Sequence, residues 1–407
     1  MRKGWNIKCL ADIAVVKGGK RVPKGYKLES EPTEHPYITI SDFTDDGTID
    51  TSNLRYVDSA IFQQIKNYTI STKDLYLSIA GTIGRTGYVP PELDGASLTE
   101  NACKLVLRPG IDRDFIYYFT KSEDFSRQAG INTRTAAQPK LALERLKTIT
   151  LSVPESLAEQ KRIVTLLDEA FAHIATAKAN AEQNLQNARA LFDSHLQSVF
   201  SQHGNDWSWK PLETISTILN GFAYKSTDFS PAVGAKCIKI TNVGVRHFFC
   251  DSSSYLPANF INVLSAVTVR KGSIAMALTR SIIAGGLKVA VVPEEYDGAL
   301  LNQRVASIET YADRLSSPFL FAYLSTDIAA NYVKERVNTL MQPNLSIADL
   351  RAMPIPVPPL LLQKAITDQI TLLQTETQRL ESIYQQKLSA LDALKKSLLH
   401  QTFSGQL

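Results

Sequence analysis

The amino-acid sequence predicts an α+β protein: two mixed α/β domains of duplicated architecture, joined by two long helices that form an antiparallel coiled coil. Two observations support this fold class. The 407-residue chain repeats itself at an offset of 202 to 204 residues. Each copy also ends in a stretch of about 44 residues that contains neither glycine nor proline. Repeats of solenoid proteins are only ~20–50 residues long, so the duplicated unit is a whole domain together with its helix.

Four pairs of matching segments define the repeat from end to end. They are Trp5–Ile13 with Trp207–Ile215, Val89–Ala96 with Val292–Ala299, Gln138–Leu141 with Gln342–Leu345, and Val199–Ser201 with Thr402–Ser404. Two diverged copies of one module in a single chain favour a protein that binds two similar but non-identical targets at once.

The first part of each copy is predicted to be a globular domain, over residues 1–156 and 204–359. Gly, Pro, Asp and Asn break both parts into short runs of β-branched and aromatic residues, which are typical of strands. Apolar helical patterns lie between these runs, so each domain is expected to be mixed α/β. The strand runs include Tyr37–Ile40, Leu75–Ile79, Lys104–Leu107, Ile238–Ile240 and Val289–Val292, and the helical patterns include Phe115–Phe119 and Phe319–Tyr323.

The second part of each copy is predicted to be a long helix, over residues 157–203 and 360–407. Apolar residues recur there in steps of four and three, the spacing of helices that pack along their length. At ~1.5 Å per residue each helix is ~65 Å long, which exceeds the width of a domain of ~150 residues, so the two helices are expected to pack on each other. The predicted seam is Ile163, Leu167, Ala170, Ile174, Ala177, Ala181, Ala188 and Leu191 in the first helix, and Ile366, Ile370, Leu373, Leu380, Tyr384, Leu391, Leu394 and Leu398 in the second.

Composition and charge indicate a soluble chain without a membrane anchor. The net charge is +4 and the isoelectric point about 8.7, a mildly basic balance that is compatible with nucleic-acid binding. No apolar run is long enough to span a bilayer, and no signal-peptide core follows the amino terminus. Cys9, Cys103, Cys237 and Cys250 have no Cys-x-x-Cys spacing, so we expect free thiols, no metal and a cytoplasmic location.

Catalytic motifs are missing from the sequence. It has no Gly-x-x-x-x-Gly-Lys-Ser/Thr phosphate loop, no Asn/Asp-Pro-Pro-Tyr/Phe of an amino-methyltransferase, no Gly-x-Ser-x-Gly and no His-Glu-x-x-His. The segment Gly81–Gly87 is rich in glycine, but no helical pattern follows it, which argues against dinucleotide binding. We therefore expect a binding protein with no catalytic residues, metal or cofactor of its own.

The order of domain, helix, domain and helix resembles the specificity subunit of type I restriction–modification enzymes, and local motifs support this resemblance. They are the family's Gly-Thr-Ile-Gly element (Gly81–Gly84), its stretch of small residues, Leu and Asn/Gln (Ala96–Asn101 and Ala299–Gln303), its Gln before the end of the domain (Gln138 and Gln342), and the Pro-Pro-Leu-x-Glu-Gln-like start of its helix (Val153–Lys161 and Val357–Lys364). The resemblance covers essentially the whole chain.

The second copy departs from the family's pattern in two places. Where the first copy has Gly-Thr-Ile-Gly, the second reads Leu278–Gly286, with extra residues. The second helix also lacks the glutamate, because Leu362 precedes Gln363. The first departure is expected of two domains that read different sequences.

The resemblance implies that the globular parts are target-recognition domains, each of which reads one half of a bipartite, asymmetric site in double-stranded DNA. The helix pair would set the distance between the half-sites and dock two methyltransferase subunits and the restriction/translocase subunits. S-adenosylmethionine, ATP and Mg would then be cofactors of the partner subunits, and none would bind to this chain.

Loop residues that can bind bases or phosphates occur at corresponding places in both copies. Lys20 and Arg21 are expected to contact phosphate. Arg85 and Arg280 are the preferred base readers, because arginine can donate two hydrogen bonds to guanine. The full set of candidates for DNA binding is Lys20, Arg21, Arg85 and Arg134 in the first domain, and Thr279, Arg280, Asn302, Gln303 and Arg304 in the second.

Other classes of function remain open from the sequence. A coiled-coil scaffold or adaptor that binds proteins but not DNA would explain the long helices, although not the duplicated, cationic domains. An adenine methyltransferase with fused recognition domains would need a cofactor motif, which the sequence lacks. Within the family, the chain can equally serve a Type IIB-like or a methylation-only complex.

Overall fold

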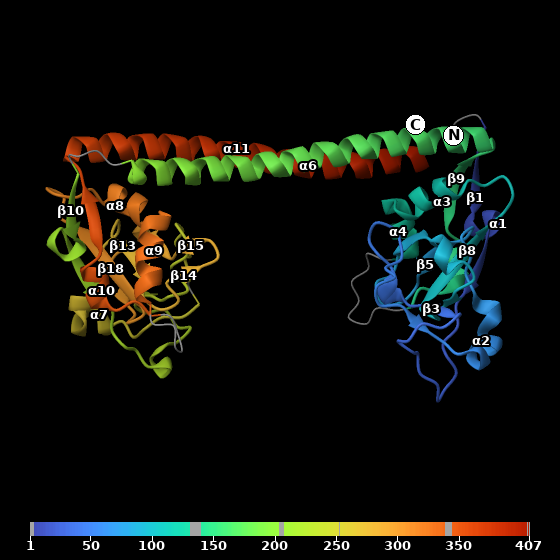
Figure 1. Cartoon of the computed structure of the whole chain (residues 1–407), viewed down its shortest axis with the longest axis horizontal. Helices are drawn as coiled ribbons and strands as arrows, with labels where there is room; N and C mark the ends of the chain where they lie inside the picture. Colours follow the sequence, from blue (N-terminus) through green and yellow to red (C-terminus); the bar gives the residue numbers. More distant parts are fainter. Residues whose placement is uncertain are drawn as a thin grey trace. The chain divides into compact units, whose positions relative to one another are not determined.

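Two compact units make up the part of the chain that the computed structural model describes, which is residues 4–130, 140–202, 207–251, 253–337, 344–404 and 406. Unit 1 comprises Met1–Glu182 and Gln386–Leu407, and unit 2 comprises Gln183–Gln385. Each unit contains one globular part and about one half of each long helix, α6 (Leu157–Ser201) and α11 (Leu360–Phe403) (Figure 1).

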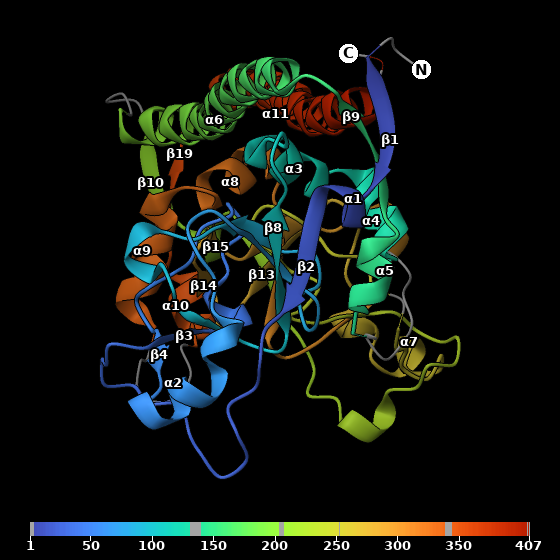
Figure 2. The same cartoon turned by 90° about the vertical axis from the view of Figure 1, so that its right-hand side faces the viewer.

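The globular part of unit 1 is built around a four-stranded antiparallel sheet in the order β2-β8-β5-β6, of which β2 and β8 are labelled in Figure 2. A second sheet, β4-β3-β7, contains the parallel pair β3 and β7, and the antiparallel pair β1 and β9 joins the beginning of the globular part to its end. The strands are β1 (Trp5–Cys9), β2 (Ala14–Gly18), β3 (Pro36–Ile38), β4 (Arg55–Tyr56), β5 (Leu75–Ser78), β6 (Thr86–Tyr88), β7 (Ser97–Leu98), β8 (Ala102–Leu107) and β9 (Thr150–Pro154). The helices are α1 (Leu10–Ile13), α2 (Ser59–Ile65), α3 (Arg113–Thr120), α4 (Glu123–Ala129) and α5 (Leu143–Lys147).

Unit 2 repeats this topology. Its four-stranded sheet has the order β11-β18-β13-β16, its parallel pair is β12 and β17, and β10 pairs with β19 as β1 pairs with β9. The added element is a hairpin of β14 and β15, in the place of the Gly81–Gly84 turn of unit 1. The strands are β10 (Ser208–Pro211), β11 (Ser216–Asn220), β12 (Cys237–Ile238), β13 (Ile274–Ala277), β14 (Ile282–Ile283), β15 (Gly286–Leu287), β16 (Val289–Val291), β17 (Leu300–Leu301), β18 (Val305–Thr310) and β19 (Pro354–Val357), and the helices are α7 (Phe260–Val263), α8 (Ser317–Leu324), α9 (Asp327–Arg336) and α10 (Ile347–Arg351). The predicted duplication of a mixed α/β domain is confirmed.

The two long helices pack antiparallel within each unit, as predicted. In unit 1, Lys178 Nζ of α6 lies 2.7 Å from Asp392 Oδ1 of α11. In unit 2, Arg189 Nε lies 2.8 Å from Glu381 Oε1. Both ion pairs are partly exposed, and ion pairs of this kind contribute at most ~1 kcal/mol to stability. They therefore show that the helices run antiparallel, while the apolar seam stabilises the packing of the two helices.

Most of the predicted seam side chains are buried or half-buried, but two are not. The buried ones are Ile163, Leu167, Ile174, Ala181, Ala188, Ile366 and Ile370, and the half-buried ones are Ala170, Ala177, Leu373, Leu380, Tyr384, Leu391 and Leu398. Leu191 is 62% exposed and Leu394 is 47% exposed, so their placement in the seam was wrong. An α-helix drifts by ~20° per heptad against a strict seven-residue repeat. Beyond Ala181, therefore, Leu185 and Phe192 face inward and are half-buried, whereas residues 184 and 191 are exposed.

The ends of the long helices also belong to the globular cores. In unit 1, the start of α6 and the end of α11 join the core beside β5, β8 and α3. The Phe403 ring lies 5.1 Å from that of Phe115 and 5.3 Å from that of Phe119. In unit 2, Phe200 at the end of α6 lies 5.3 Å from Phe319 and 5.5 Å from Tyr323 of α8. The last turn of α11 therefore packs in the globular core of unit 1, where α6 begins. The last turn of α6 packs in the globular core of unit 2, where α11 begins.

A buried glutamine anchors the first turn of each long helix. The Gln160 amide is 1% exposed: its Oε1 accepts a hydrogen bond from the Asp112 amide (2.7 Å), and its Nε2 donates to the carbonyls of Gly110 (3.1 Å) and Pro154 (3.0 Å). Gln363 is fully buried and makes the same three bonds, to the Ser316 amide and to the Arg314 and Pro358 carbonyls, at 2.8 to 3.0 Å. Each glutamine therefore ties its helix to the loop that precedes α3 or α8.

We predict that Gln160→Leu lowers the free energy of unfolding of unit 1 by about 1–3 kcal/mol, because the Asp112 amide and two carbonyls lose a buried partner. Urea unfolding, with hydrogen exchange of the first turn of α3 as the local readout, measures this loss. The control is Gln186→Leu, since Gln186 is an exposed residue of the same helix. Equal stability of the two variants would show that the glutamine is not an anchor.

Candidate nucleic-acid interface

Four strand ends meet at one edge of the main sheet in each unit. In unit 1, β2 and β5 end there and β8 and β6 begin there, because each pair is antiparallel. We call the loops at this place the loop edge: residues 19–28, 79–85 and 99–101 in unit 1, and residues 221–226, 278–288 and 302–304 in unit 2. In Figure 2, β2 points away from α6 and α11, so the chain that follows it lies remote from the helix layer of unit 1.

The backbone of the loop edge is built alike in both units. The Lys20 amide donates to the Leu98 carbonyl and the Phe222 amide to the Leu301 carbonyl, both at 2.8 Å. A side chain on the preceding glycine is excluded in each case, since a Cβ at Gly19 would lie 2.1 Å from a carbonyl oxygen and one at Gly221 would lie 2.2 Å from another. Both units therefore present loops on the same frame, and their differences lie in the side chains.

The loop edge of unit 1 is cationic. Lys20 and Arg21 are exposed; Lys20 Nζ lies 5.6 Å from the centre of the Tyr68 ring, and Arg21 Nε lies 2.6 Å from Glu100 Oε1. Partial burial favours a raised pKa of Glu100, but the hydrogen bond from Arg21 helps to hold this pKa below its ordinary value. Lys140, which the sequence reasoning did not select, donates to the Glu100 carbonyl at 2.6 Å.

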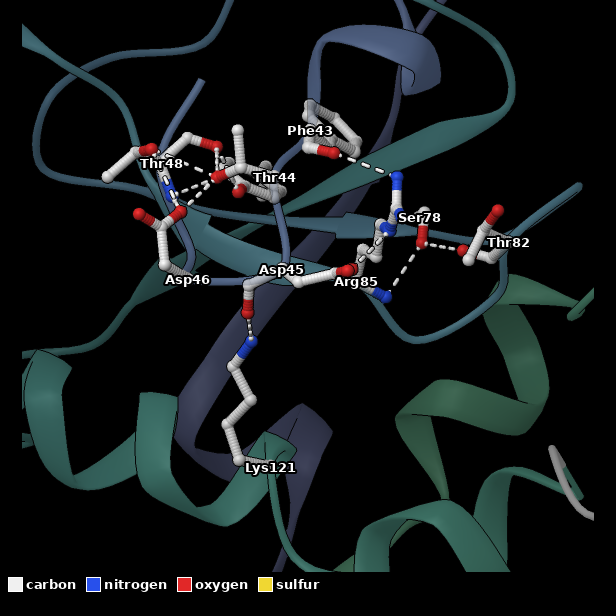
Figure 3. A network of polar contacts seen from close by, with 10 residues as sticks. Phe43, Thr44, Asp45, Asp46, Thr48, Ser78, Thr82, Arg85 and Lys121 are labelled. Carbon is white, nitrogen blue, oxygen red and sulfur yellow. Dashed lines mark hydrogen bonds and ion pairs between the residues drawn. The ribbon is translucent and has the colours of Figure 1, made fainter. Parts of the chain in front are cut away.

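Arg85 is held by protein groups. Figure 3 shows its guanidinium between the turn at residues 78–85 and the segment at residues 43–48. Its Nη1 donates to the Phe43 carbonyl at 2.9 Å, its Nε lies 2.9 Å from Asp45 Oδ1, and 30% of its side chain is exposed. The Asp45 carbonyl in turn accepts from Lys121 Nζ of α3 at 3.3 Å. Arg85 thus braces the turn against this segment, and contact with a base would require it to leave these partners.

Arg280 of unit 2 is in a different situation. It is exposed and has a positive φ of 48°, which few residues other than glycine adopt. Within the described part of the chain, its guanidinium has no hydrogen-bond or ion-pair partner. The neighbouring Thr279 is 9% exposed and forms a β-bridge with Asn344. Arg280 is therefore the freer of the two preferred arginines.

The remaining candidates of unit 2 lie next to Arg280. The Arg304 carbonyl accepts from the Leu278 amide at 2.8 Å, and Asn302 Oδ1 accepts from the Arg304 amide at 3.2 Å. Gln303 and Arg304 are exposed, and Asn302 is half-buried. The structure thus brings Thr279, Arg280, Asn302, Gln303 and Arg304 together at one edge.

The site in the structure differs from the site predicted from the sequence in three respects. Arg134 lies outside the described residues. Phe222, which is 46% exposed, occupies the position of Lys20 in unit 2, and aligning the repeat at Gly19 and Gly221 would have found it. The hairpin of β14 and β15 was visible only as extra residues, and its position at the loop edge depends on the pairing of β13 with β18.

In the described part of the chain, no helix has the length and apolar character needed to cross a membrane. Among the same residues, no group of three or more His, Cys, Asp or Glu is placed to hold a metal ion.

Comparison with known proteins places the chain among restriction–modification proteins. The type I restriction modification DNA specificity domain matches residues 2–187 and 205–389. The MjaVIII type I specificity subunit of Methanocaldococcus jannaschii is 25% identical over 314 residues, 73% of this chain and 71% of that protein. The EcoAI specificity subunit of Escherichia coli is 31% identical over 129 residues, 31% of this chain and 21% of that protein.

Two solved structures have the same fold. A chain from a study of complex assembly and conformational transition of the type I R-M system aligns with a TM-score of 0.77 at 16% identity, covering 100% of this chain and 99% of that chain. The HsdS subunit from Thermoanaerobacter tengcongensis aligns with a TM-score of 0.65 at 17% identity, covering 100% of this chain and 98% of that chain.

We predict that Arg85→Ala loosens the turn at residues 79–85 and the segment at residues 43–48 together, because one guanidinium contacts both. Amide hydrogen exchange should become faster in both segments and stay unchanged in β8. Arg108→Ala, at the far end of β8, serves as the control. Faster exchange in the turn alone would contradict the bracing role of Arg85.

Proposed function

This chain belongs to the type I restriction–modification DNA specificity family, and from that premise we propose that it selects the DNA site by reading one half of a bipartite, asymmetric sequence with each unit. The observation that carries the proposal is the pair of loop edges. They share one backbone frame but differ in side chains, with Lys20 and Arg21 in unit 1 and Phe222 and Arg280 in unit 2. A shared frame with different side chains is what two related but unequal half-sites require.

The charge of the loop edges supports DNA as the ligand. Lys20, Arg21, Arg280 and Arg304 are exposed there, and cationic groups of this kind supply the phosphate contacts that position a protein on DNA. Asn302 and Gln303 add amides, which can pair with adenine in the major groove.

The helix pair is proposed to dock two methyltransferase subunits and the restriction/translocase subunits. Its surface supports this role, because large apolar side chains on it are exposed to solvent. They include Leu166, Leu191, Leu372, Ile383 and Leu394, which are 43 to 66% exposed. The chain itself would have no catalytic role, and S-adenosylmethionine, ATP and Mg would bind to the partner subunits.

Co-expression of the chain with a type I methyltransferase subunit from the same genome tests the proposal. Long-read sequencing of the genomic DNA should then detect adenine methylation in a single motif, with two defined halves separated by an unspecified gap. An active complex that methylates no defined motif would contradict site selection and favour the adaptor function. Repeating the experiment with the restriction subunit present or absent distinguishes a restriction complex from a methylation-only complex.

We predict that Arg280→Ala weakens binding to sites with the correct second half by about 1–3 kcal/mol, the value of one bidentate contact between arginine and a base. Binding of the purified complex to matched and mutated half-sites at constant salt measures the effect. The control is Arg270→Ala: Arg270 is exposed at the opposite end of β13 and lies 3.1 Å from Glu309. Unchanged discrimination in Arg280→Ala would exclude Arg280 as a base reader.

A further inference from the structure

The hairpin of β14 and β15 gives unit 2 an apolar projection at its loop edge. It lies between the end of β13 and the start of β16, where unit 1 has a short turn. The pairs Ile282 with Leu287 and Ile283 with Gly286 define its register, so Ala284 and Gly285 form the tip. No side chain from residue 282 to residue 287 carries a polar group.

The hairpin is anchored on one side and free on the other. Leu287 is 3% exposed and belongs to the core of unit 2, against which Ile282 packs. Ile283, the next residue of β14, has the opposite orientation because side chains alternate along a strand, and it is 50% exposed. Gly286 has a φ of 119°, a conformation that side chains disfavour. The anchored hairpin therefore holds one large apolar side chain in solvent.

The surroundings of Ile283 are cationic. Arg280 precedes the hairpin and Arg304 lies beside residue 278, and both are exposed. Lys288 follows the hairpin, and its Nζ donates to the Ile240 carbonyl at 2.8 Å. Burial, and then the positive charge of Arg280, lower the pKa of Lys288. An apolar hairpin with cations at its base fits a ligand that has anionic groups beside a small apolar feature.

Double-stranded DNA has this combination in its major groove. The C5-methyl group of thymine is the apolar feature that the base edges present there, and phosphates flank the groove. Ala284 at the tip is exposed and has only a methyl group, so the tip can approach the bases closely. The corresponding turn of unit 1 offers no such contact, because Ile83 is half-buried against the core.

We propose that Ile283 is a specificity-determining residue, which reads the C5-methyl group of a thymine in the second half-site. This inference rests on the proposed function and extends it to one residue and one chemical group. Unit 2 then combines an apolar contact from Ile283 with polar contacts from Arg280 and Gln303, whereas unit 1 reads its half-site without an apolar tip.

Substitution of uracil for thymine tests the proposal, because uracil pairs with adenine but lacks the methyl group. The probes are duplexes of the mapped site in which each thymine of the second half is replaced in turn, and the protein is the complex with its methyltransferase subunits. One replacement should weaken binding by about fourfold, the value of one buried methyl group. Ile283→Ala should bind the thymine duplex about as weakly and should not distinguish the two duplexes.

Val291→Ala is the matched control, since Val291 is a 40% exposed apolar residue at the end of β16 opposite to the loop edge. This variant should distinguish thymine from uracil as the original chain does. If the original chain bound every uracil duplex as tightly as the thymine duplex, the inference would be overturned. An Ile283→Ala complex that still distinguishes thymine from uracil would also overturn it. A complex that binds a scrambled second half-site as tightly as the correct one would overturn both this inference and the proposed function.

Discussion

The burial of the last turn of each long helix in a globular core is the interaction on which the rest of the structure depends. Phe403 packs between Phe115 and Phe119, and Phe200 packs against Phe319 and Tyr323. Aromatic side chains bury large apolar areas. If the last turn of a long helix left the globular core, the apolar area of its phenylalanine would be exposed to water. The globular part of unit 1 is thus completed by residues from the far end of the chain, and that of unit 2 by the last turn of the helix that precedes it. In unit 1, β5, β8 and α3 therefore have a defined position relative to the helix ends of that unit.

The two buried glutamines fix the orientation of the first turn of each long helix, which apolar packing alone does not. Gln160 and Gln363 each use both ends of the amide, so only one orientation of the first helical turn satisfies all three bonds. The glutamate that the second copy lacks has no part in these bonds. In the first copy, Glu159 pairs with Arg162 on the helix surface, at 2.8 Å. The missing glutamate of the second copy therefore does not affect the anchor at Gln363, because the buried amide of the glutamine makes all three hydrogen bonds.

The two loop edges share one backbone frame but carry different side chains. Backbone hydrogen bonds and the close approach at Gly19 and Gly221 are the same in both units, because a side chain at either glycine would collide with a carbonyl. The side chains around them are free to differ. Arg85 contacts Phe43 and Asp45 and so joins the turn to that segment. The equivalent region of unit 2 is extended into a hairpin beside Arg280, which has no hydrogen-bond or ion-pair partner among the described residues.

The sequence by itself determined the duplication, the mixed α/β character of each globular part, and the helices that begin at Leu157 and Leu360, because these depend on local signals: repeated motifs, glycine and proline, and apolar periodicity. Only the tertiary structure decided which side chains of the long helices face inward beyond Ala181, since the drift of an α-helix against a seven-residue repeat accumulates along its length. It also decided that Arg85 is paired, whereas Arg280 has no partner among the residues that the structure describes. The partners of Arg85 are about forty residues away in the chain, and only the packing of one segment on another brings such groups within hydrogen-bonding distance.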